Sequence, residues 1–356
     1  ATFSVYNIAT QDGDDTVNIT SNSTTLQSGN LDALLGQVRV DNGAGDDALN
    51  ISDYTAGVAD TYTVEETGSG QETVVRFNGT AADDVLYNAN VTDVGANGSN
   101  AANAGTLEDF HLVGSETGDN TYNINDTTGT ETNTIDDGDA TTTASNNATF
   151  NIQADSVQPG AENTFNGFDG NDTFNASFAA DTTVPTAGGT TFVINGGAVG
   201  ADPANRDIVN LDVTADTVAR AAASGIRMVY ADATKASGDL NVTGNDTSVS
   251  TDPGLGADPA NAANGLDLNQ VEQVNYLGSS ADDDTLLVAG TTADDTLSVT
   301  PLDGNEANVF IDGAPLLTIP PDAYNTNNPG VVSLIAGPDI NLDGLAQAGG
   351  LTMAGG

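Results

Sequence analysis

Carboxylates recur along this chain in short turn sequences, at a spacing that suits the binding of hard cations. Each turn begins with Gly, continues through small polar residues to an Asp-Asp, Asp-Asn or Asn-Asp doublet, and leads into an alternating apolar segment. Calcium binds six to eight oxygens from carboxylates, amide and backbone carbonyls and water. These turns therefore predict several Ca²⁺ sites per chain. The predicted ligands are Asp12, Asp14, Asp15, Asp46, Asp47, Asp83, Asp84, Asp119, Asp136, Asp137, Asp139, Asp169, Asn171, Asp172, Asp246, Asp282, Asp283, Asp284, Asp294 and Asp295.

A second interpretation of the same doublets is structural, because Asp and Asn side chains bond readily to the backbone of turns. The charge of the chain favours cations: 51 Asp and Glu face 6 Lys and Arg, a formal net charge of -45. Self-repulsion on this scale opposes compaction unless cations or salt offset it. No segment has the ligand order of an EF-hand loop or of the tight Gly-Gly-x-Gly-x-Asp array. The calcium prediction thus rests on composition and recurrence.

Other chemistries find little support. Cysteine is absent and His111 is the one histidine, which argues against thiolate chemistry, His-based metal sites and a Ser-His-Asp triad. We expect His111 to be a packed or solvent-facing strand residue. The chain has no Trp and few basic residues, so a polysaccharide-degrading β-helix enzyme with paired carboxylates stays only a second alternative. The expectation is a protein without enzymatic activity.

Partners and location follow from the same composition. The six basic residues form no cluster in the sequence, and phosphate binding needs clustered Lys and Arg, so nucleic acid is not an expected partner. No run approaches the roughly 20 apolar residues of a membrane helix, and no membrane insertion is expected. The opening residues 1–5 already resemble a strand, as in a mature form after signal cleavage. An extracellular or cell-surface location is expected.

The doublets recur at a spacing that predicts a repeat architecture. Their second residues, with Asp207 as a weaker member, are separated by 32, 37, 36, 52, 35, 39 and 38 residues. One period of about 36 dominates, with an insertion expected where the spacing is 52, and such periods are typical of solenoids and domain arrays. Each unit has room for roughly three strands of five or six residues. The residues that set these spacings are Asp15, Asp47, Asp84, Asn120, Asp172, Asp207, Asp246 and Asp284.

The segments between the turns alternate apolar and polar residues, as half-buried strands do. Examples are residues 16–19, 37–40, 271–276 and 285–288. We therefore predict an all-β fold, a β-solenoid resembling a parallel β-helix with a repeat of about 36 residues, and tandem β-sandwich domains as the alternative. Residues 1–330 are expected to form one continuous β-repeat domain with loop insertions. The aromatic residues expected in its core are Tyr122, Phe150, Phe165, Phe174, Phe192, Tyr276 and Phe310.

Sequons of the Asn-x-Ser/Thr type are abundant, so the chain is also a candidate glycoprotein. Chains rich in Asn and Thr create such sequons by chance, and several of them overlap the acidic doublets. They begin at Asn18, Asn22, Asn50, Asn78, Asn90, Asn97, Asn125, Asn147, Asn171, Asn175, Asn241 and Asn245.

Three segments, residues 271–276, 278–288 and 290–299, resemble units of large bacterial β-strand-repeat surface proteins. These include calcium-binding repeat proteins of the RTX-like and adhesin-like kind. The resemblance covers most of the chain at the level of the repeated phrase. It implies secretion, calcium-assisted folding of a β-solenoid, and a role in adhesion, surface layers or fibres. The repeat of this chain is longer and less regular, so no calcium geometry transfers residue by residue.

The expected function is that of a secreted structural protein that self-assembles into an extracellular fibre or surface layer, stabilised by calcium at the acidic turns. A solenoid exposes strand edges at its ends, and stacking of a further copy covers them. We expect a homo-oligomer or filament formed by head-to-tail contact, with the apolar segments 1–9 and 331–353 taking part. The C-terminal tail, residues 331–356, is expected at the subunit contact. The alternative is an adhesive or carbohydrate-binding module of a larger surface protein, with glycans as ligands.

Overall fold

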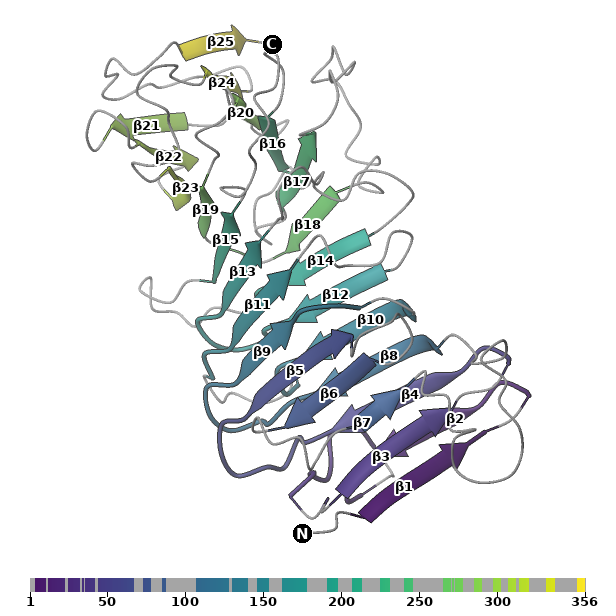
Figure 1. Cartoon of the computed structure of the whole chain (residues 1–356). Coiled ribbons are helices and arrows are strands. Elements are labelled where there is room, and N and C mark those ends of the chain that lie inside the picture. Colours follow the sequence, from purple (N-terminus) through teal and green to yellow (C-terminus); the bar gives the residue numbers. More distant parts are fainter. Residues whose placement is uncertain are drawn as a thin grey trace. The chain divides into compact units, whose positions relative to one another are not determined.

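The computed structural model consists of strands and turns over all the residues that it describes (Figure 1). These are residues 4–10, 12–22, 25–32, 34, 36–41, 44–66, 73–77, 85–87, 107–127, 130–139, 146–153, 162–177, 191–197, 207–212, 225–230, 240–245, 265–269, 271, 273–277, 285–289, 297–301, 307–311, 314–319, 331–336 and 351–355. In this part of the chain no helix is long and apolar enough to cross a membrane. The all-β class predicted from the sequence is confirmed.

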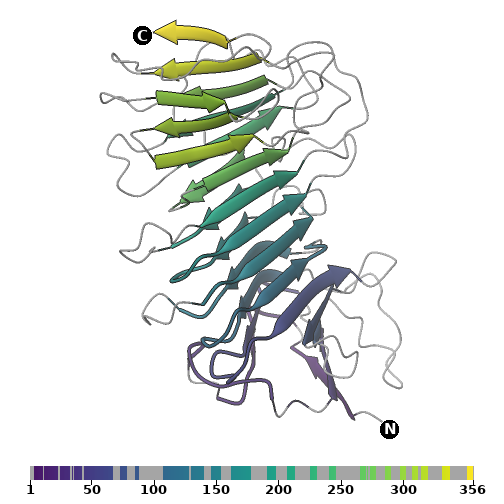
Figure 2. The ribbon, with the colours of Figure 1, turned by 90° about the vertical axis from the view of Figure 1, so that its left-hand side faces the viewer.

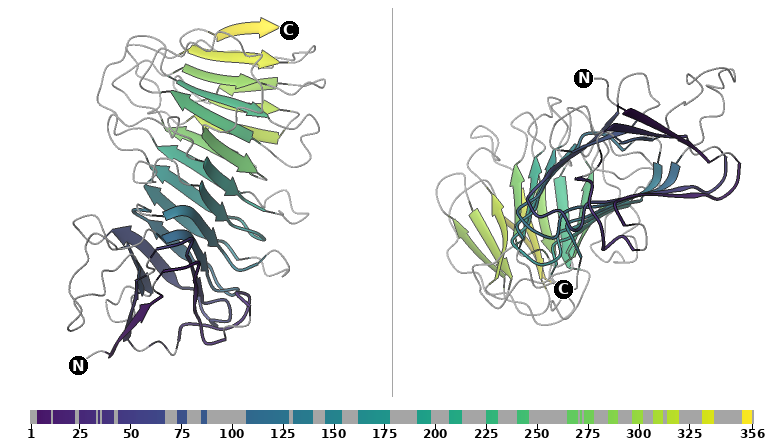
Figure 3. Two further views of the ribbon diagram at one scale, coloured as in Figure 1. Left: turned by 90° about the vertical axis from the view of Figure 1, so that its right-hand side faces the viewer. Right: turned by 90° about the horizontal axis from the view of Figure 1, so that it is seen from below.

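The chain divides into two compact units, Ala1–Asp172 and Thr173–Gly356. The first unit contains two sheets, with the strand orders β1-β3-β7-β6-β5-β9-β11 and β2-β4-β8-β10-β12. Figure 3 gives a view of this unit from below. Its strands are β1 (Ser4–Ala9), β2 (Thr16–Ile19), β3 (Gly36–Asp41), β4 (Ala48–Ser52), β5 (Thr61–Glu66), β6 (Thr73–Phe77), β7 (Val85–Tyr87), β8 (Leu107–Val113), β9 (Thr121–Ile124), β10 (Thr130–Asp136), β11 (Thr149–Gln153) and β12 (Glu162–Asn166).

Successive strands of the regular coils alternate between the two sheets, and each pairs in parallel with the strand of the coil before it. Paired residues lie 32 apart in β2 and β4 (Thr16 with Ala48), 28 apart in β9 and β11, and 30 apart in β10 and β12. One coil therefore contains two strands. The expectation of about three strands per repeat was wrong, because the turn sequences occupy more of each coil than the strands do.

An antiparallel meander interrupts these coils. Strand β6 pairs antiparallel with both β5 and β7, while β5 is parallel to β9 and β7 is parallel to β3. In the other sheet, β4 pairs directly with β8, so that Ala48 lies opposite Asp109, 61 residues later. The meander thus lengthens this coil to 61 residues without adding a further coil.

Parallel, in-register pairing places equivalent side chains above one another, and this builds the core. Tyr62 stacks on Tyr122 with ring centroids 5.1 Å apart, and Tyr122 stacks on Phe150 at 4.6 Å. Aromatic pairs in such offset arrangements add stabilisation beyond their buried area. The predicted core residues Tyr122, Phe150, Phe165 and Phe174 are fully buried. The side chains of Phe192, Tyr276 and Phe310 lie outside the described set.

The outward faces of the strands carry amide ladders. Asn50 Nδ2 donates to Asn18 Oδ1 at 2.9 Å, and Asn151 Nδ2 donates to Asn123 Oδ1 at the same distance. Such bonds pair polar side chains from adjacent strands. Two predicted sequons, at Asn18 and Asn50, lie in one ladder, and a glycan on Asn50 Nδ2 would interfere with this hydrogen bond.

The second unit also contains two sheets, ordered β13-β15-β19-β23-β22-β21 and β14-β18-β17-β16-β20-β24-β25. Strands β13 and β15 pair in parallel with Thr173 opposite Ile208, and β16–β18 and β21–β23 are antiparallel meanders. Figure 2 shows these strands side by side. They are β13 (Thr173–Ser177), β14 (Thr191–Asn195), β15 (Ile208–Asp212), β16 (Gly225–Tyr230), β17 (Leu240–Asn245), β18 (Gly265–Asn269), β19 (Gln273–Leu277), β20 (Thr285–Ala289), β21 (Leu297–Pro301), β22 (Ala307–Ile311), β23 (Ala314–Ile319), β24 (Val331–Ala336) and β25 (Leu351–Gly355).

The C-terminal residues belong to this second unit. Strands β24 and β25 extend its sheet in parallel, with Val332 opposite Leu351. Long parallel sheets of regularly spaced strands, in both units, are consistent with a parallel β-solenoid-like arrangement. The tandem β-sandwich alternative predicts antiparallel sheets instead.

Candidate functional site: the acidic doublet turns

The doublets of adjacent coils bond to each other in both directions. The backbone N–H of Asp46 donates to Asp14 Oδ1 at 3.1 Å, and the backbone N–H of Asp15 donates to Asp47 Oδ1 at 2.9 Å. The first residue of a doublet thus caps the N–H of the next coil, and the second residue caps the N–H of the coil before. We call this reciprocal pair of bonds the doublet interlock.

The doublet interlock recurs further along the first unit. Asn171 N–H donates to Asn147 Oδ1 at 3.0 Å, and Ala148 N–H donates to Asp172 Oδ1 at 2.7 Å. This coil was missed from the sequence, because Ala148 replaces the expected acid. The spacing of 52 residues before Asp172 is therefore a complete additional coil and not an insertion. The recurring Thr-aromatic-Asn strand sequence, which begins again at Thr149, is the signal that could have shown it.

Single bonds of the same kind occur where one partner is alanine. Asp60 N–H donates to Asn120 Oδ1 at 2.9 Å, and Asn147 N–H donates to Asp119 Oδ1 at 3.0 Å. The second hydrogen bond of each interlock would need an acceptor on the side chain of Ala59 or Ala148, and alanine has none. The preference for Asp or Asn at both positions thus follows from hydrogen bonding between coils.

Glycine before the doublet lets the turns of adjacent coils approach closely. A Cβ on Gly170 would lie 1.6 Å from the carbonyl oxygen of Asn146, and one on Gly45 would lie 2.2 Å from that of Gly13. Gly45 also has φ of +149°, a conformation that residues with a side chain rarely adopt. Backbone contact between turns therefore explains the glycine of the repeated phrase.

The first and second residues of these doublets differ in burial. The second residues Asp47, Asn120 and Asp172 are at most 2% exposed, whereas the first residues Asp14, Asp46 and Asp119 are exposed. Burial raises the pKa of Asp47, the Asp15 N–H opposes this, and the nearby charges of Glu108, Asp15 and Asp14 raise the pKa further. Both residues of a doublet can cap a backbone N–H, but only the first one also remains exposed to solvent and ions.

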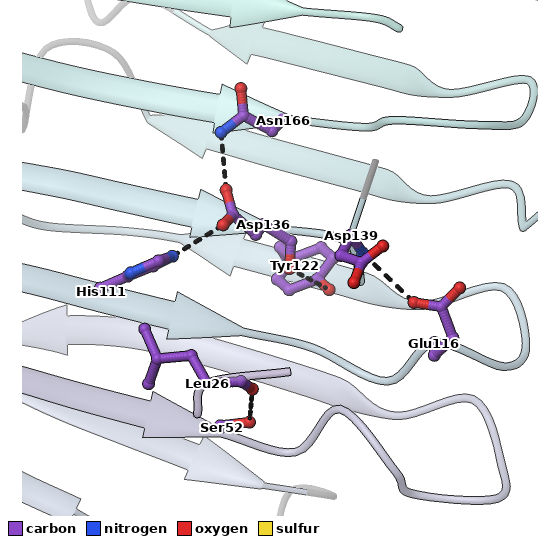
Figure 4. A network of polar contacts seen from close by, with 8 residues as sticks. All are labelled: Leu26, Ser52, His111, Glu116, Tyr122, Asp136, Asp139 and Asn166. Atoms are coloured by element: carbon purple, nitrogen blue, oxygen red, sulfur yellow. Dashed lines mark hydrogen bonds and ion pairs between the residues drawn. The ribbon is translucent and has the colours of Figure 1, made fainter. Parts of the chain in front are cut away.

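In the sequence cluster Asp136, Asp137 and Asp139, the side chains of Asp136 and Asp139 point to different partners (Figure 4). Asp136 binds His111 Nε2 at 2.7 Å and Asn166 Nδ2 at 2.6 Å. His111 is half-buried on β8, as a packed strand residue. The side chain of Asp139 instead accepts a hydrogen bond from the hydroxyl of Tyr54. The three carboxylates thus have separate partners.

Asp137 is a buried member of that cluster. Its Oδ1 accepts from Asn120 Nδ2 at 2.6 Å and from the Tyr122 hydroxyl at 2.9 Å. Burial is the largest cause that raises its pKa, to about 7, and the charges of Glu116 and Asp119 act in the same direction. Burial is also the largest cause that raises the pKa of the Tyr122 hydroxyl.

Glu116 lies near two further acids, Asp139 and Asp169, whose charges act on it. The Tyr54 hydroxyl donates to Asp139 Oδ2 at 3.2 Å. Asp139 N–H donates to Glu116 Oε2 at the same distance (Figure 4). Burial raises the pKa of Glu116, the Tyr54 hydrogen bond opposes this shift, and the charges of Asp139 and Asp169 add to the rise. Asp139 and Asp169 thus repel the charged form of Glu116 when no cation is bound.

A second buried network was not predicted from the sequence. Asp53 Oδ1 accepts from Leu31 N–H at 2.7 Å, and Asp53 Oδ2 accepts from the Tyr62 hydroxyl at 3.0 Å. Burial is the main cause that raises the pKa of Asp53 to about 7, and the neighbouring Asp60 contributes. Asp53 lies outside every doublet, so the repeat offered no signal for it.

The predicted metal ligands can now be compared with their positions. Within the described ranges, no group of three or more His, Cys, Asp or Glu is arranged to hold a metal ion. Second residues such as Asp47 and Asp172 accept hydrogen bonds from backbone N–H groups of the preceding coil. The predicted ligands that lie outside the described residues are Asp83, Asp84, Asp246, Asp282, Asp283, Asp284, Asp294 and Asp295.

Comparison with protein-family models, curated proteins and solved structures finds no match to this chain. The resemblance to bacterial calcium-binding surface repeats therefore remains a hypothesis based on the repeated phrases.

Proposed function

We propose that this chain is a secreted, non-enzymatic structural protein that stacks head to tail into an extracellular fibre or surface layer. In this proposal the fold is a β-solenoid whose sequence repeat averages about 36 residues, because loops and meanders lengthen many of its coils. Calcium at the acidic turns reduces the repulsion between chains. The proposal rests on one observation, an exposed position on β1 that is buried in the following coils.

That position is occupied by Tyr6 on β1. Tyr6 pairs with Val38, which pairs with Val85, so the three share one column of the sheet. Val38 is 5% exposed and Val85 is fully buried, whereas Tyr6 is 53% exposed. Strand β1 thus exposes a position that is buried in the following coils.

The edges of the same end also lack neighbours within the described strands. Strands β1 and β2 are each the first in their sheet, with a neighbour on one side only. Exposed strand edges are templates for pairing with another chain. Val5 on β1, 47% exposed, adds to the uncovered apolar surface. A further coil from another chain would cover the edges and the apolar side chains together.

Charge makes this association depend on cations. Each chain carries a formal net charge of -45, and charges closer than the Debye length, about 8 Å at physiological ionic strength, repel one another with little screening. The exposed first carboxylates, such as Asp14 and Asp46, lie at the surface where divalent ions can associate. Calcium in this role neutralises charge and does not require a preformed cage.

The test is sedimentation velocity with negative-stain microscopy in calcium and then in EGTA. We expect filaments or sheets in calcium and smaller species after chelation. Tyr6→Asp should abolish assembly. The control is Val58→Asp, which adds the same charge at a turn position that is 61% exposed. This variant should still assemble. Monomers of the unmodified chain under all conditions would contradict the proposed function and favour the adhesive module.

A further inference from the structure

We propose that Asn147 is an acceptor for an N-linked glycan, and that the stacking of the coils favours it over the other described sequons. Glycans are bulky groups on the surface of secreted proteins. Of the proposed function, this inference therefore rests only on secretion. The sequons whose asparagine side chain is described begin at Asn18, Asn22, Asn50, Asn125, Asn147, Asn171 and Asn175.

The transfer reaction defines what such an acceptor needs. The amide nitrogen Nδ2 attacks the anomeric carbon of a lipid-linked oligosaccharide, the bond from that carbon to the phosphate oxygen breaks, and the lipid diphosphate leaves. One proton of Nδ2 passes to a base of the transferase, so the product keeps one N–H and the carbonyl Oδ1 as an acceptor. A coil therefore accommodates a glycan best at an exposed asparagine whose Nδ2 makes no bond and whose sequon hydroxyl is not engaged.

Asn147 meets these conditions. Its N–H donates to Asp119 Oδ1 at 3.0 Å, and its Oδ1 accepts from the N–H of Asn171 at 3.0 Å. Its Nδ2 makes no bond with the described residues, and the residue is exposed. Thr149, the third residue of the sequon, is half-buried at the start of β11, and within the described part of the chain its hydroxyl makes no bond either. A glycan on Nδ2 thus leaves both bonds of Asn147 to the neighbouring coils in place.

The preceding residue fixes this turn from the inside. Asn146 is 9% exposed, its Nδ2 donates to the carbonyl oxygen of Glu116, and its Oδ1 accepts from the N–H of Gly118 at 3.3 Å. Both amide groups of Asn146 are therefore used between coils, whereas Asn147 uses only its oxygen. The unbonded nitrogen of Asn147 thus lies on a turn whose position is already set by its neighbour.

Two other sequons have an amide nitrogen that is bonded between strands. Asn50 Nδ2 donates to Asn18 Oδ1 at 2.9 Å, and Asn125 Nδ2 donates to Glu65 Oε2 at 3.5 Å. A sugar on either nitrogen would crowd the side chain of the adjacent strand. These two positions are therefore poorer acceptors than Asn147.

The remaining described sequons are engaged in other ways. In the sequon of Asn18, the Thr20 hydroxyl donates to the carbonyl oxygen of Ser28 at 3.3 Å. Additional interactions within the chain involve the asparagines of three more sequons, Asn22, Asn171 and Asn175. Among the described sequons, the one at Asn147 thus combines an exposed, unbonded Nδ2 with an unbonded hydroxyl.

The test maps the glycans on the full chain, secreted from a eukaryotic host that carries the transferase. Peptide N-glycosidase F in heavy-oxygen water converts each glycosylated asparagine to a labelled aspartate, which mass spectrometry locates. We expect the label at Asn147, and at least tenfold less of it at Asn50 and Asn125. An unlabelled Asn147, or equal labelling of Asn50 or Asn125, would overturn the inference.

Two threonine variants provide the matched comparison. Thr149→Ala removes the sequon but leaves the bonds of Asn147, so it should abolish this label. Thr121→Ala is the control, because Thr121 pairs with Thr149 in the adjacent strand and belongs to no sequon. This control should keep the label at Asn147, and loss of the label from both variants alike would contradict the role of the sequon hydroxyl.

Sedimentation of the same preparations in calcium separates this inference from the proposed function. Chains that assemble but carry no glycan at Asn147 would overturn this inference alone. Chains that carry the glycan and stay monomeric, with the Thr149→Ala variant monomeric as well, would overturn the proposed assembly and leave the glycosylation site standing.

Discussion

The carboxylate of Asp47 accepts a hydrogen bond from the backbone N–H of Asp15, 32 residues earlier, at 2.9 Å. This bond joins one turn to the next and is matched by the reverse bond from Asp46 N–H to Asp14. An Asp or Asn doublet is therefore a device for holding parallel coils in register. The residue that such a turn buries is unsuited to a solvent-accessible cation site.

Removing the Asp47 carboxylate should destabilise the first unit. Asp47→Ala leaves the Asp15 N–H without its partner and should lower the free energy of unfolding by about 1–3 kcal/mol. Asp47→Asn keeps an acceptor and removes a buried charge, so its stability should equal or exceed that of the unmodified chain. Urea titration followed by circular dichroism measures both. Equal losses in the two variants would refute the capping role.

The glycine contacts predict a position-dependent cost of adding one methyl group. Gly170→Ala places a Cβ 1.6 Å from the Asn146 carbonyl oxygen and should destabilise by roughly 2 kcal/mol or more. Gly57→Ala meets no atom within 4 Å and should be neutral. Thermal unfolding of the two variants makes the comparison. A neutral Gly170→Ala would mean that adjacent turns do not approach as the structure shows.

Stability should fall as the pH rises from about 4 to about 7. The folded-state pKa of Asp53 is raised to about 7, mainly by burial, while an unfolded Asp titrates near 4. In this window the unfolded chain has lost the proton that the folded chain keeps, so folding becomes less favourable with rising pH. The contribution reaches at most about 4 kcal/mol at 1.36 kcal/mol per pKa unit.

The matched variant for this pH dependence is Asp53→Asn, which cannot titrate. Urea midpoints at several pH values between 4 and 8 should show a shallower slope for Asp53→Asn than for the unmodified chain. The exposed Asp32→Asn serves as the control and should keep the original slope. Parallel slopes for all three proteins would show that Asp53 is not held protonated.

Calcium binding should follow the exposed acids and not the buried ones. In native mass spectrometry, Asp14→Asn with Asp46→Asn should reduce the number of bound calcium ions, because both side chains are exposed. Asp47→Asn should leave that number unchanged, since Asp47 is 2% exposed. If Asp47→Asn lost more bound calcium ions than the double variant, this assignment would be reversed.

The repeated turn-and-strand segment could be recognised in the sequence, because turn and strand preferences depend on local residues. Alternating residues such as those of Thr16–Ile19 favour strands, and Gly-rich acidic segments favour turns, so the all-β class and the buried positions of Tyr122 and Phe150 followed from composition and spacing. The extra coil at Ala148 was missed, because its doublet lacks the acid on which the spacing analysis depended.

Which carboxylates become buried caps and which remain at the surface was decided by the tertiary structure alone. The bonds of the doublet interlock join residues 24 to 32 positions apart, and no property of a single turn tells Asp14 from Asp15. The same holds for Asp53, whose partners come from other segments. The sequence determined where the chain turns, because turn preferences are local. The stacking of coils determined what each acid does, because burial and hydrogen bonding depend on the neighbouring coil.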